Sequence, residues 1–293
     1  MRAHGFPMDG YLVCLCYTGF TMNDTQGGNE TMYEHHRQSI ENLLDYFKDD
    51  QQITAIVLGG SVAKGCARED SDIDAILVVP ESRYACLERE NRLTECVYGH
   101  CTYEKGYFDL KYCTKAYLKA LAREGSEPSR NAFLSAQCLF SKDPEIEELV
   151  SSIPVFQKAE QQEKMLSFYA AFRLNSGYFW RVSGDNPYLR ARVTADMVLF
   201  GLRLLLEENE VLYPCHKALL QTVAALKNRP EQLVDDAVLF LQNPTEENKT
   251  RFEQRVLGAL VFQPPADYSE VLTHYTDANE LWWYKHRPCI AEW

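Results

Sequence analysis

The spacing of apolar residues changes near residue 155, and this change divides the sequence into two parts. Before it, the short apolar runs at 53–58 and 72–79 predict buried strands, because turn residues or a proline bound each run. Helical spacing precedes the first run, where Ile40 and Leu43 fall on one face. After residue 155 only helical spacing remains. The pattern therefore predicts a part with alternating strands and helices, followed by an all-helical part.

The individual elements follow from these runs and from the capping and breaking residues between them. In the first part we expect helices at 31–49, 61–66, 82–96 and 114–124, strands at 53–58, 72–79, 97–103 and 106–113, and a helix, a short strand at 139–140 and a further helix within 129–150. In the second part we expect helices at 157–182, 187–208, 214–227, 230–242, 245–262 and 268–285.

Domain boundaries are expected where these patterns stop. Gly27-Gly28-Asn29 indicates a flexible joint before the first helix, and Ser151-Ser152-Ile153-Pro154 separates the two parts. The expected organisation is an N-terminal extension at 1–28, a catalytic domain at 29–153 and a helical domain at 154–293.

Composition excludes several classes of protein. The chain has 42 acidic and 30 basic residues and a net charge of -12, so a nucleic-acid partner is not expected. No apolar run reaches the ~20 residues that span a membrane. The ten cysteines contain no C-x-x-C pair, which favours reduced thiols in a cytoplasmic protein.

Asp72 and Asp74 are the first candidate catalytic residues. They lie two apart in a run that otherwise has the pattern of a strand, so both carboxylates face the same side. Two carboxylates at this distance repel each other, and a divalent cation would compensate them. Oxygen ligands of this kind suit Mg²⁺ or Mn²⁺, so the pair predicts a metal site.

Gly60-Ser61 follows the first predicted strand and begins a short helix. Glycine lets the backbone approach a ligand closely, and the first N–H groups of a helix bind anions. The dipeptide therefore predicts a phosphate site beside the metal. Lys64 lies one helical turn further on, where it would reach a phosphate; the alternative is a solvated lysine.

Gly60-Ser61, ten intervening residues and Asp72-x-Asp74 together resemble the DNA polymerase beta-like nucleotidyltransferase superfamily. The run GGSVAKG…SDID is similar to its small bacterial members, including the aminoglycoside nucleotidyltransferases. The resemblance implies an α+β fold, with a mixed β-sheet and flanking helices followed by a helical bundle that binds the acceptor. It also implies that the two Asp residues hold the metals and that the Gly-Ser turn holds a nucleoside triphosphate.

The resemblance implies two further site residues. Ser71 matches the family's S-D-x-D form. The family's third carboxylate lies on a later strand between apolar residues, which Phe108-Asp109-Leu110 matches; there it completes one metal site and helps to activate the acceptor hydroxyl. Glu104 is the alternative, but its neighbours are more typical of a turn.

The helical part contributes two candidate ligands, His216 and Lys217, for nucleotide phosphates or the acceptor. Lys217 lies in the segment Tyr213-Pro214-Cys215-His216-Lys217, which gathers polar groups at the start of a predicted helix. Either Lys217 binds nucleotide phosphates or it is an ordinary surface residue. Arg192 and Asp196 are four apart and predict an ion pair on one helix face.

These residues together predict a Mg²⁺-dependent nucleotidyltransferase that acts as a monomer or homodimer. It would transfer a nucleoside monophosphate, with ATP as the expected donor, to a hydroxyl of a small-molecule acceptor such as an aminoglycoside-like compound. A protein-directed nucleotidyltransferase and a non-catalytic nucleotide sensor are the alternatives. The three carboxylates Asp72, Asp74 and Asp109 weigh against the sensor.

Overall fold

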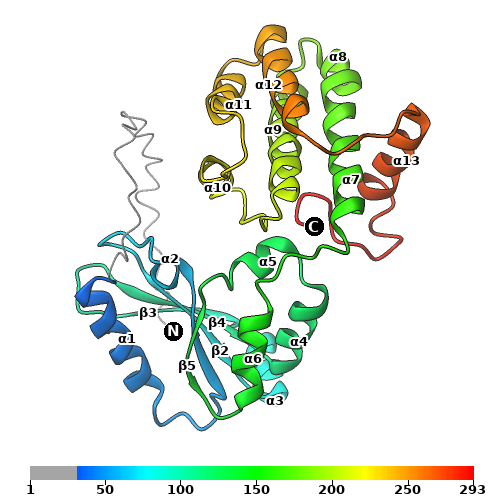
Figure 1. Cartoon of the computed structure of the whole chain (residues 1–293). Helices are drawn as coiled ribbons and strands as arrows, with labels where there is room; N and C mark the ends of the chain where they lie inside the picture. Colours follow the sequence, from blue (N-terminus) through cyan, green and yellow to red (C-terminus); the bar gives the residue numbers. More distant parts are fainter. Residues whose placement is uncertain (1–31) are drawn as a thin grey trace, which may run out of the picture. The chain divides into compact units, whose positions relative to one another are not determined.

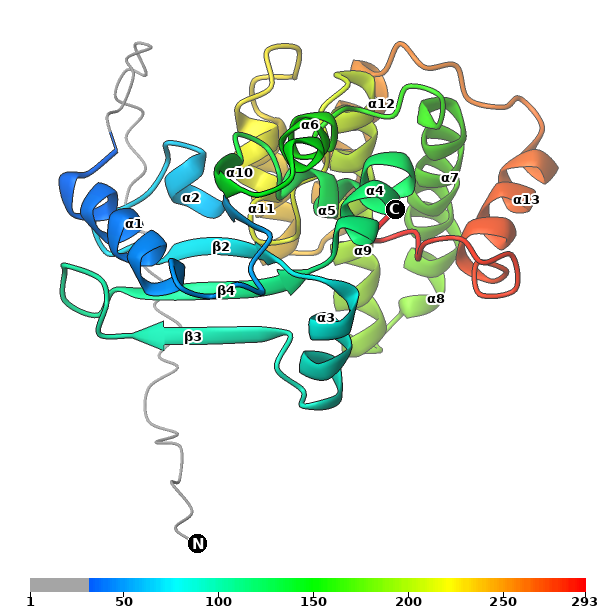
Figure 2. The same ribbon diagram turned by 90° about the horizontal axis from the view of Figure 1, so that it is seen from below.

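Five strands form one mixed sheet in the structure, a computed structural model that describes residues 32–293 (Figure 1). The predicted extension at 1–28 lies outside the described residues. The strands are β1 (Ala55–Leu58), β2 (Ile73–Val78), β3 (Thr94–Tyr98), β4 (Tyr107–Cys113) and β5 (Gln137–Ser141). Their order is β3-β4-β2-β1-β5; β2 and β4 are parallel, and the other neighbouring strands are antiparallel. Figure 2 shows β2, β4 and β3 side by side. The mixed sheet and the helices after it confirm the predicted α+β fold.

Alternation along the strands sends side chains to two covered faces of the sheet. Ile73 and Leu77 of β2 pack with Leu43 of α1 (Glu34–Phe47) on one face. Val57 and Val78 pack on the other face. That second face is covered by α4 (Lys115–Glu124) and α6 (Pro144–Ser152), whose apolar residues Leu118, Leu121, Ile146 and Val150 belong to the same cluster. Asp74 alternates with Ile73, so it lies on the face of α4 and α6.

The expected helix at 82–96 is too long. Helix α3 (Glu81–Arg89) ends where Asn91 takes a positive φ of 55°, a conformation that stops a right-handed helix. Strand β3 then begins at Thr94 and ends before Gly99, so the strand expected at 97–103 is misplaced. The two other helices in this part are α2 (Gly60–Ala63) and α5 (Glu127–Asn131).

The second part of the chain is helical, as predicted. Its helices are α7 (Gln161–Leu174), the π-helix η1 (Asn175–Phe179), α8 (Trp180–Ser183), α9 (Pro187–Glu208), α10 (Leu219–Ala224), α11 (Leu233–Gln242), α12 (Glu246–Ala259) and α13 (Tyr268–Asn279). Three of these, α7, η1 and α8, follow one another without a break where one helix was expected at 157–182. Asn186 caps α9 by accepting a hydrogen bond from the N–H of Leu189 at 3.0 Å.

Helix α10 is shorter than the pattern at 214–227 predicts. The segment 211–218 before it is not helical, because the N–H of Tyr213 donates to the buried Glu127 at 2.9 Å and Pro214 has no N–H to offer. A tertiary hydrogen bond therefore outweighs the local helical pattern.

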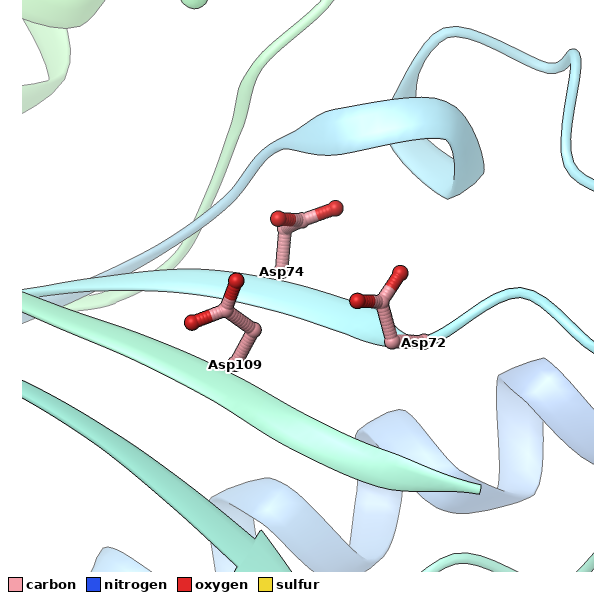
Figure 3. Close-up of side chains that lie close together, drawn as sticks. All are labelled: Asp72, Asp74 and Asp109. Carbon is pink, nitrogen blue, oxygen red and sulfur yellow. The ribbon is translucent and has the colours of Figure 1, made fainter. Parts of the chain in front are cut away.

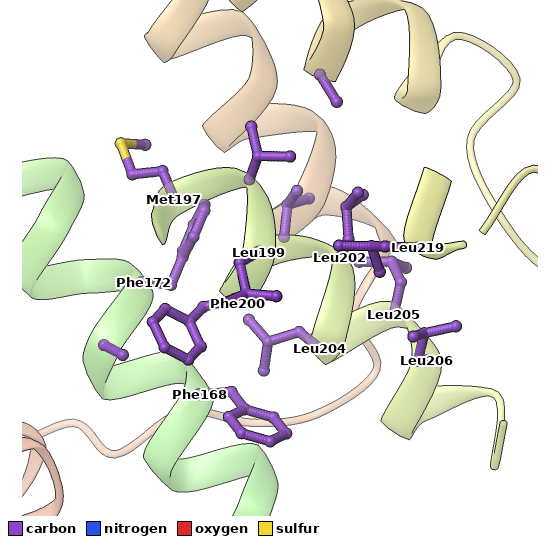
Figure 4. Close-up of a cluster of buried hydrophobic side chains, with 14 of the residues drawn as sticks. Phe168, Phe172, Met197, Leu199, Phe200, Leu202, Leu204, Leu205, Leu206 and Leu219 are labelled. Atoms are coloured by element: carbon purple, nitrogen blue, oxygen red, sulfur yellow. The ribbon is translucent and has the colours of Figure 1, made fainter. Parts of the chain in front are cut away.

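The core of the helical part is centred on α9, whose side chains are buried over most of its length (Figure 4). Phe168 and Phe172 of α7 and Met197 and Leu204 of α9 are inaccessible to solvent. No helix within residues 32–293 is both long and apolar enough to cross a membrane. The division into domains at 29–153 and 154–293 stays a prediction.

Candidate active site

Asp72, Asp74 and Asp109 converge at one point of the sheet (Figure 3). Each offers a carboxylate oxygen, and these oxygens all lie within 4.8 Å of one another. The parallel register of β2 and β4 places Asp74 directly opposite Asp109, while Asp72 precedes β2 by one residue. Residues two apart along a strand point to the same face of the sheet, so the carboxylate of Asp72 lies on the face of Asp74 and Asp109. The structure therefore gathers the three carboxylates that the sequence singles out.

Gly60 lies against the carboxylate of Asp74. A Cβ atom at Gly60 would stand 1.8 Å from Oδ2 of Asp74, and the φ of Gly60 is +64°. Both facts require glycine, because no other side chain fits this space and conformation. The N–H of Gly59 donates to the carbonyl of Asp74 at 3.0 Å, which ties the turn to β2.

The charges of the three carboxylates are poorly compensated by the protein. Burial, and then the neighbouring charges of Asp72 and Asp109, raise the pKa of Asp74 to about 6. Lys111 and Lys217 oppose this shift without abolishing it. A divalent cation among the three carboxylates would remove the repulsion, so the donor set and its electrostatics fit a bound metal.

A cavity of about 920 Å³ opens on this face of the sheet. It is lined by Asp74 and Asp109, by the turn at Gly59 and Gly60, and by residues of the helical part. The helical part contributes Pro214, Cys215, Ala218 and Glu292. Cavities of this size hold drug-sized ligands in other proteins, so the carboxylates face a space large enough for a substrate.

The other residues predicted from sequence take different positions around the carboxylates. Lys64 lines the cavity, and its ammonium group donates to Oδ1 of Asn131 at 3.0 Å. Lys217 is exposed, and its charge lowers the pKa of Asp74, so it lies within electrostatic reach. Ser61 is half-buried in the same short helix as Gly60. Ser71 turns its hydroxyl to the N–H of Arg68 at 2.9 Å and shapes the loop before Asp72.

Sequence reasoning missed three residues beside the carboxylates. Lys111 lines the cavity two residues after Asp109, and Tyr107 lies two residues before it. Hydrogen bonding to Asp72 raises the pKa of the Tyr107 phenol. Strand alternation would have placed both on the face of Asp109. Asn131 carries no such signal, because its partners Lys64 and Leu212 are distant in sequence.

Comparison with known proteins identifies the domain that carries these residues. Residues 40–124 match the family model described as a nucleotidyltransferase domain. The chain contains a nucleotidyltransferase domain. The match includes the Gly60 turn and all three carboxylates, and it confirms both the expected resemblance and the enzyme class. Nucleotidyl transfer from a nucleoside triphosphate is the reaction of this domain.

The remaining comparisons concern curated sequences and solved structures. No curated protein matches the chain in sequence. Among solved structures, a nucleotidyltransferase-like protein from Exiguobacterium sibiricum 255-15 shares 9% identity at a TM-score of 0.42, covering 83% of this chain and 77% of that one. A spectinomycin adenyltransferase from Enterococcus faecialis, solved with ATP and spectinomycin, shares 13% identity at a TM-score of 0.28, covering 83% of this chain and 96% of that one.

Binding of a divalent cation should weaken as the pH falls below about 6. A raised pKa means that Asp74 is protonated below this value, and a cation has to displace that proton. We expect the affinity for Mn²⁺ to fall by up to about tenfold for each pH unit between 6 and 5. Calorimetric titration of Mn²⁺ from pH 8 to pH 5 measures this; an unchanged affinity down to pH 5 would contradict it.

The raised pKa of Asp74 has the opposite effect on the stability of the metal-free protein. The pKa of Asp74 in the folded protein lies above the ordinary aspartate value of 3.8, so the folded form binds more protons between pH 3.8 and about 6 than the unfolded form does. Protonation of Asp74 therefore stabilises the metal-free fold as the pH falls from about 6 towards 4. Metal affinity and metal-free stability should thus respond to pH in opposite directions.

Proposed function

We propose that this nucleotidyltransferase transfers a nucleoside monophosphate from ATP to a hydroxyl of a small-molecule acceptor and requires Mg²⁺. The observation that carries the proposal is that carboxylate oxygens of Asp72, Asp74 and Asp109 lie within 4.8 Å of one another, and that Asp74 and Asp109 line the cavity. A space of about 920 Å³ supports a nucleotide and a small acceptor bound side by side.

In this proposal the three carboxylates have different roles. Asp72 and Asp74 bind both metal ions, and Asp109 binds one of them and orients the acceptor hydroxyl or takes its proton. Bound Mg²⁺ supplies charge stabilisation for the phosphoryl group during transfer. Asp74 is the common element, because it lies between the Gly60 turn and the partner strand.

In this proposal the Gly60 turn and nearby lysine side chains bind the triphosphate. Gly60 and Ser61 hold the β- and γ-phosphates through the close approach that glycine permits. Lys64 adds a positive charge on the same side of the cavity, and Lys217 adds one from the helical part. Ser71 supports the loop that presents Asp72. The helical part and the tyrosines of the cavity wall, Tyr84, Tyr112 and Tyr117, offer surfaces for the acceptor or the base.

A screen of nucleotides against pooled acceptors tests the proposal. Each of radiolabelled ATP, GTP, CTP and UTP is incubated with Mg²⁺ and pools of hydroxyl-bearing small molecules. Pyrophosphate release is measured with and without the acceptor, and the molecules that carry label are identified. We expect release that depends on both acceptor and metal, and that is fastest with ATP. Nucleotide binding without release over every pool would favour a sensor, and label transferred to a protein would favour a protein-directed enzyme.

A further inference from the structure

A second cavity of about 320 Å³ lies within the helical part, and none of its lining residues lines the cavity at Asp74. Its walls come from η1, α9 and α13 and from the segment 289–291. Volumes near 300 Å³ are at the lower end of those that bind small molecules, so this space suits a compact ligand. The proposed nucleotidyl transfer makes no use of it.

The polar groups of this second cavity have free oxygen acceptors. Asp196, whose side chain is 17% exposed, accepts from Nε of Arg192 at 2.7 Å through Oδ2. Its other oxygen has no hydrogen-bond partner within residues 32–293. Asn175 and Asn279 donate their amide nitrogens to the carbonyls of Ala171 and Tyr275, at 2.9 and 3.0 Å. Their amide oxygens also lack partners in the part of the chain that the structure describes, although Asn175 is only 6% exposed.

Aromatic rings form another part of the wall. Phe179, Tyr275 and Trp282 all line the second cavity. The rings of Phe179 and Tyr275 are 5.9 Å apart at an angle of 42°. Aromatic faces attract cations, and three rings beside free oxygen acceptors provide both interactions that a protonated amine requires.

The π-helix places two of these residues on the cavity wall. Asn175 begins η1 and Phe179 ends it, and both line the second cavity. Such widened turns are rare and are found frequently at functional sites. The irregular turn is thus part of the cavity itself and not an unrelated feature of the long helix.

Arg192 is the cation that already faces Asp196. Its side chain is 61% exposed, and ion pairs that solvent reaches contribute little to stability, so a ligand displaces Arg192 at little cost. Burial raises the pKa of Asp196, although Arg192 and His216 act to lower it. The carboxylate is therefore incompletely compensated, and a second positive group beside it would be favourable.

We propose that the second cavity binds a compact organic cation, namely a protonated amine carried on an apolar or aromatic body. The ammonium group donates to Asp196 and to the amide oxygens of Asn175 and Asn279. The apolar body packs against Phe179, Tyr275 and Trp282. The site is separate from the proposed nucleotidyl transfer, and either proposal stands if the other fails.

Calorimetric titration with two ligands of the same shape tests the proposal. Phenethylamine is a cation at neutral pH, whereas 2-phenylethanol is neutral. We expect phenethylamine to bind the full chain at least about tenfold more tightly, because only the amine pairs with the carboxylate and the rings. Equal affinities, or no binding of phenethylamine at millimolar concentration, would overturn the proposal.

Variants locate the binding site. Asp196→Asn should weaken phenethylamine at least about tenfold and leave 2-phenylethanol unchanged, while Asp235→Asn, an exposed acid on α11, should change neither. Trp282→Ala should weaken the binding of both ligands. Because Trp282 is 38% exposed, we expect this variant to fold, so it tests the site if Asp196→Asn fails to fold. Asp74→Asn should bind phenethylamine normally. Loss of binding in Asp74→Asn would place the amine in the other cavity and refute the second site.

Discussion

Replacing Asp74 by asparagine should lower the rate of nucleotidyl transfer by about 10³-fold or more. Asparagine keeps the shape that packs against Gly60 and removes the charge shared by both proposed metal sites. Loss of metal-assisted charge stabilisation amounts to several kcal/mol, and each 1.4 kcal/mol corresponds to about tenfold in rate. Pyrophosphate release under saturating ATP and Mg²⁺ measures the effect.

The matched control for this variant is Asp70→Asn in the same segment. Asp70 is a 70% exposed side chain that pairs with Arg68, so its replacement should leave activity within about twofold of the wild type. The thermal stability of metal-free Asp74→Asn should equal or exceed that of the wild type at pH 8, because one of three repelling charges is gone. More than a tenth of wild-type activity in Asp74→Asn would contradict the proposed role.

The sequence predicted the strands of the site well because their signal is local. Strands β1 and β2 are mostly buried apolar runs, and an aspartate within such a run is conspicuous; β4 instead alternates buried and more accessible positions. Strand β3 was misplaced because its residues alternate between exposed and half-buried positions at an edge of the sheet. An edge strand has a weaker apolar pattern, and the expected helix at 82–96 extended across its start.

The site residues also differ in whether a local sequence pattern reveals them. Asp72 and Asp74 stood out by their spacing, whereas Asp109 was found through the resemblance alone and its register with Asp74 came from the fold. Contacts such as that of Asn131 with Leu212, 81 residues apart, have no local signal. Residues that join the two parts of the chain are therefore the ones that sequence patterns do not reveal.

Glu127 is the most consequential of these joining residues. It is 1% exposed in α5, and its carboxylate pairs with Lys164 at 2.8 Å and with Arg203 at 3.4 Å. It also accepts the N–H of Tyr213 at 2.9 Å. All three partners belong to the helical part. One buried charge thus holds α5 of the sheet-containing part to α7, α9 and the segment before α10.

A second buried glutamate, Glu207, lies beside the ionised Glu127 and is uncharged. Burial, and then the Glu127 carboxyl group, raise the pKa of Glu207 to about 10, so Glu207 is neutral at pH 7. Burial acts to raise the pKa of Glu127 as well, but the neighbouring Glu207 carboxyl, Arg203 and Lys164 outweigh it and the pKa is lowered. The two cations are therefore compensated by Glu127 as their buried carboxylate, and Lys164 also pairs with the more exposed Glu160 at 3.2 Å.

Replacing each glutamate by glutamine should consequently give very different results. Glu127→Gln removes the charge opposite two buried cations and should lower the free energy of unfolding by about 3–5 kcal/mol. Glu207→Gln replaces a neutral acid by a neutral amide of the same shape and should cost less than about 1 kcal/mol. Urea unfolding of both variants at pH 7 measures the difference.

The double variant shows whether Glu207 responds to the loss of Glu127. In Glu127→Gln the pKa of Glu207 should fall, because Lys164 and Arg203 then face no other fully buried carboxylate in the described part of the chain. Its ionisation would recover part of the lost stability. We therefore expect the double variant Glu127→Gln/Glu207→Gln to lose more stability than the sum of the single variants. Additive losses would show that Glu207 stays neutral, and equal losses in the two single variants would contradict the assignment of the charge to Glu127.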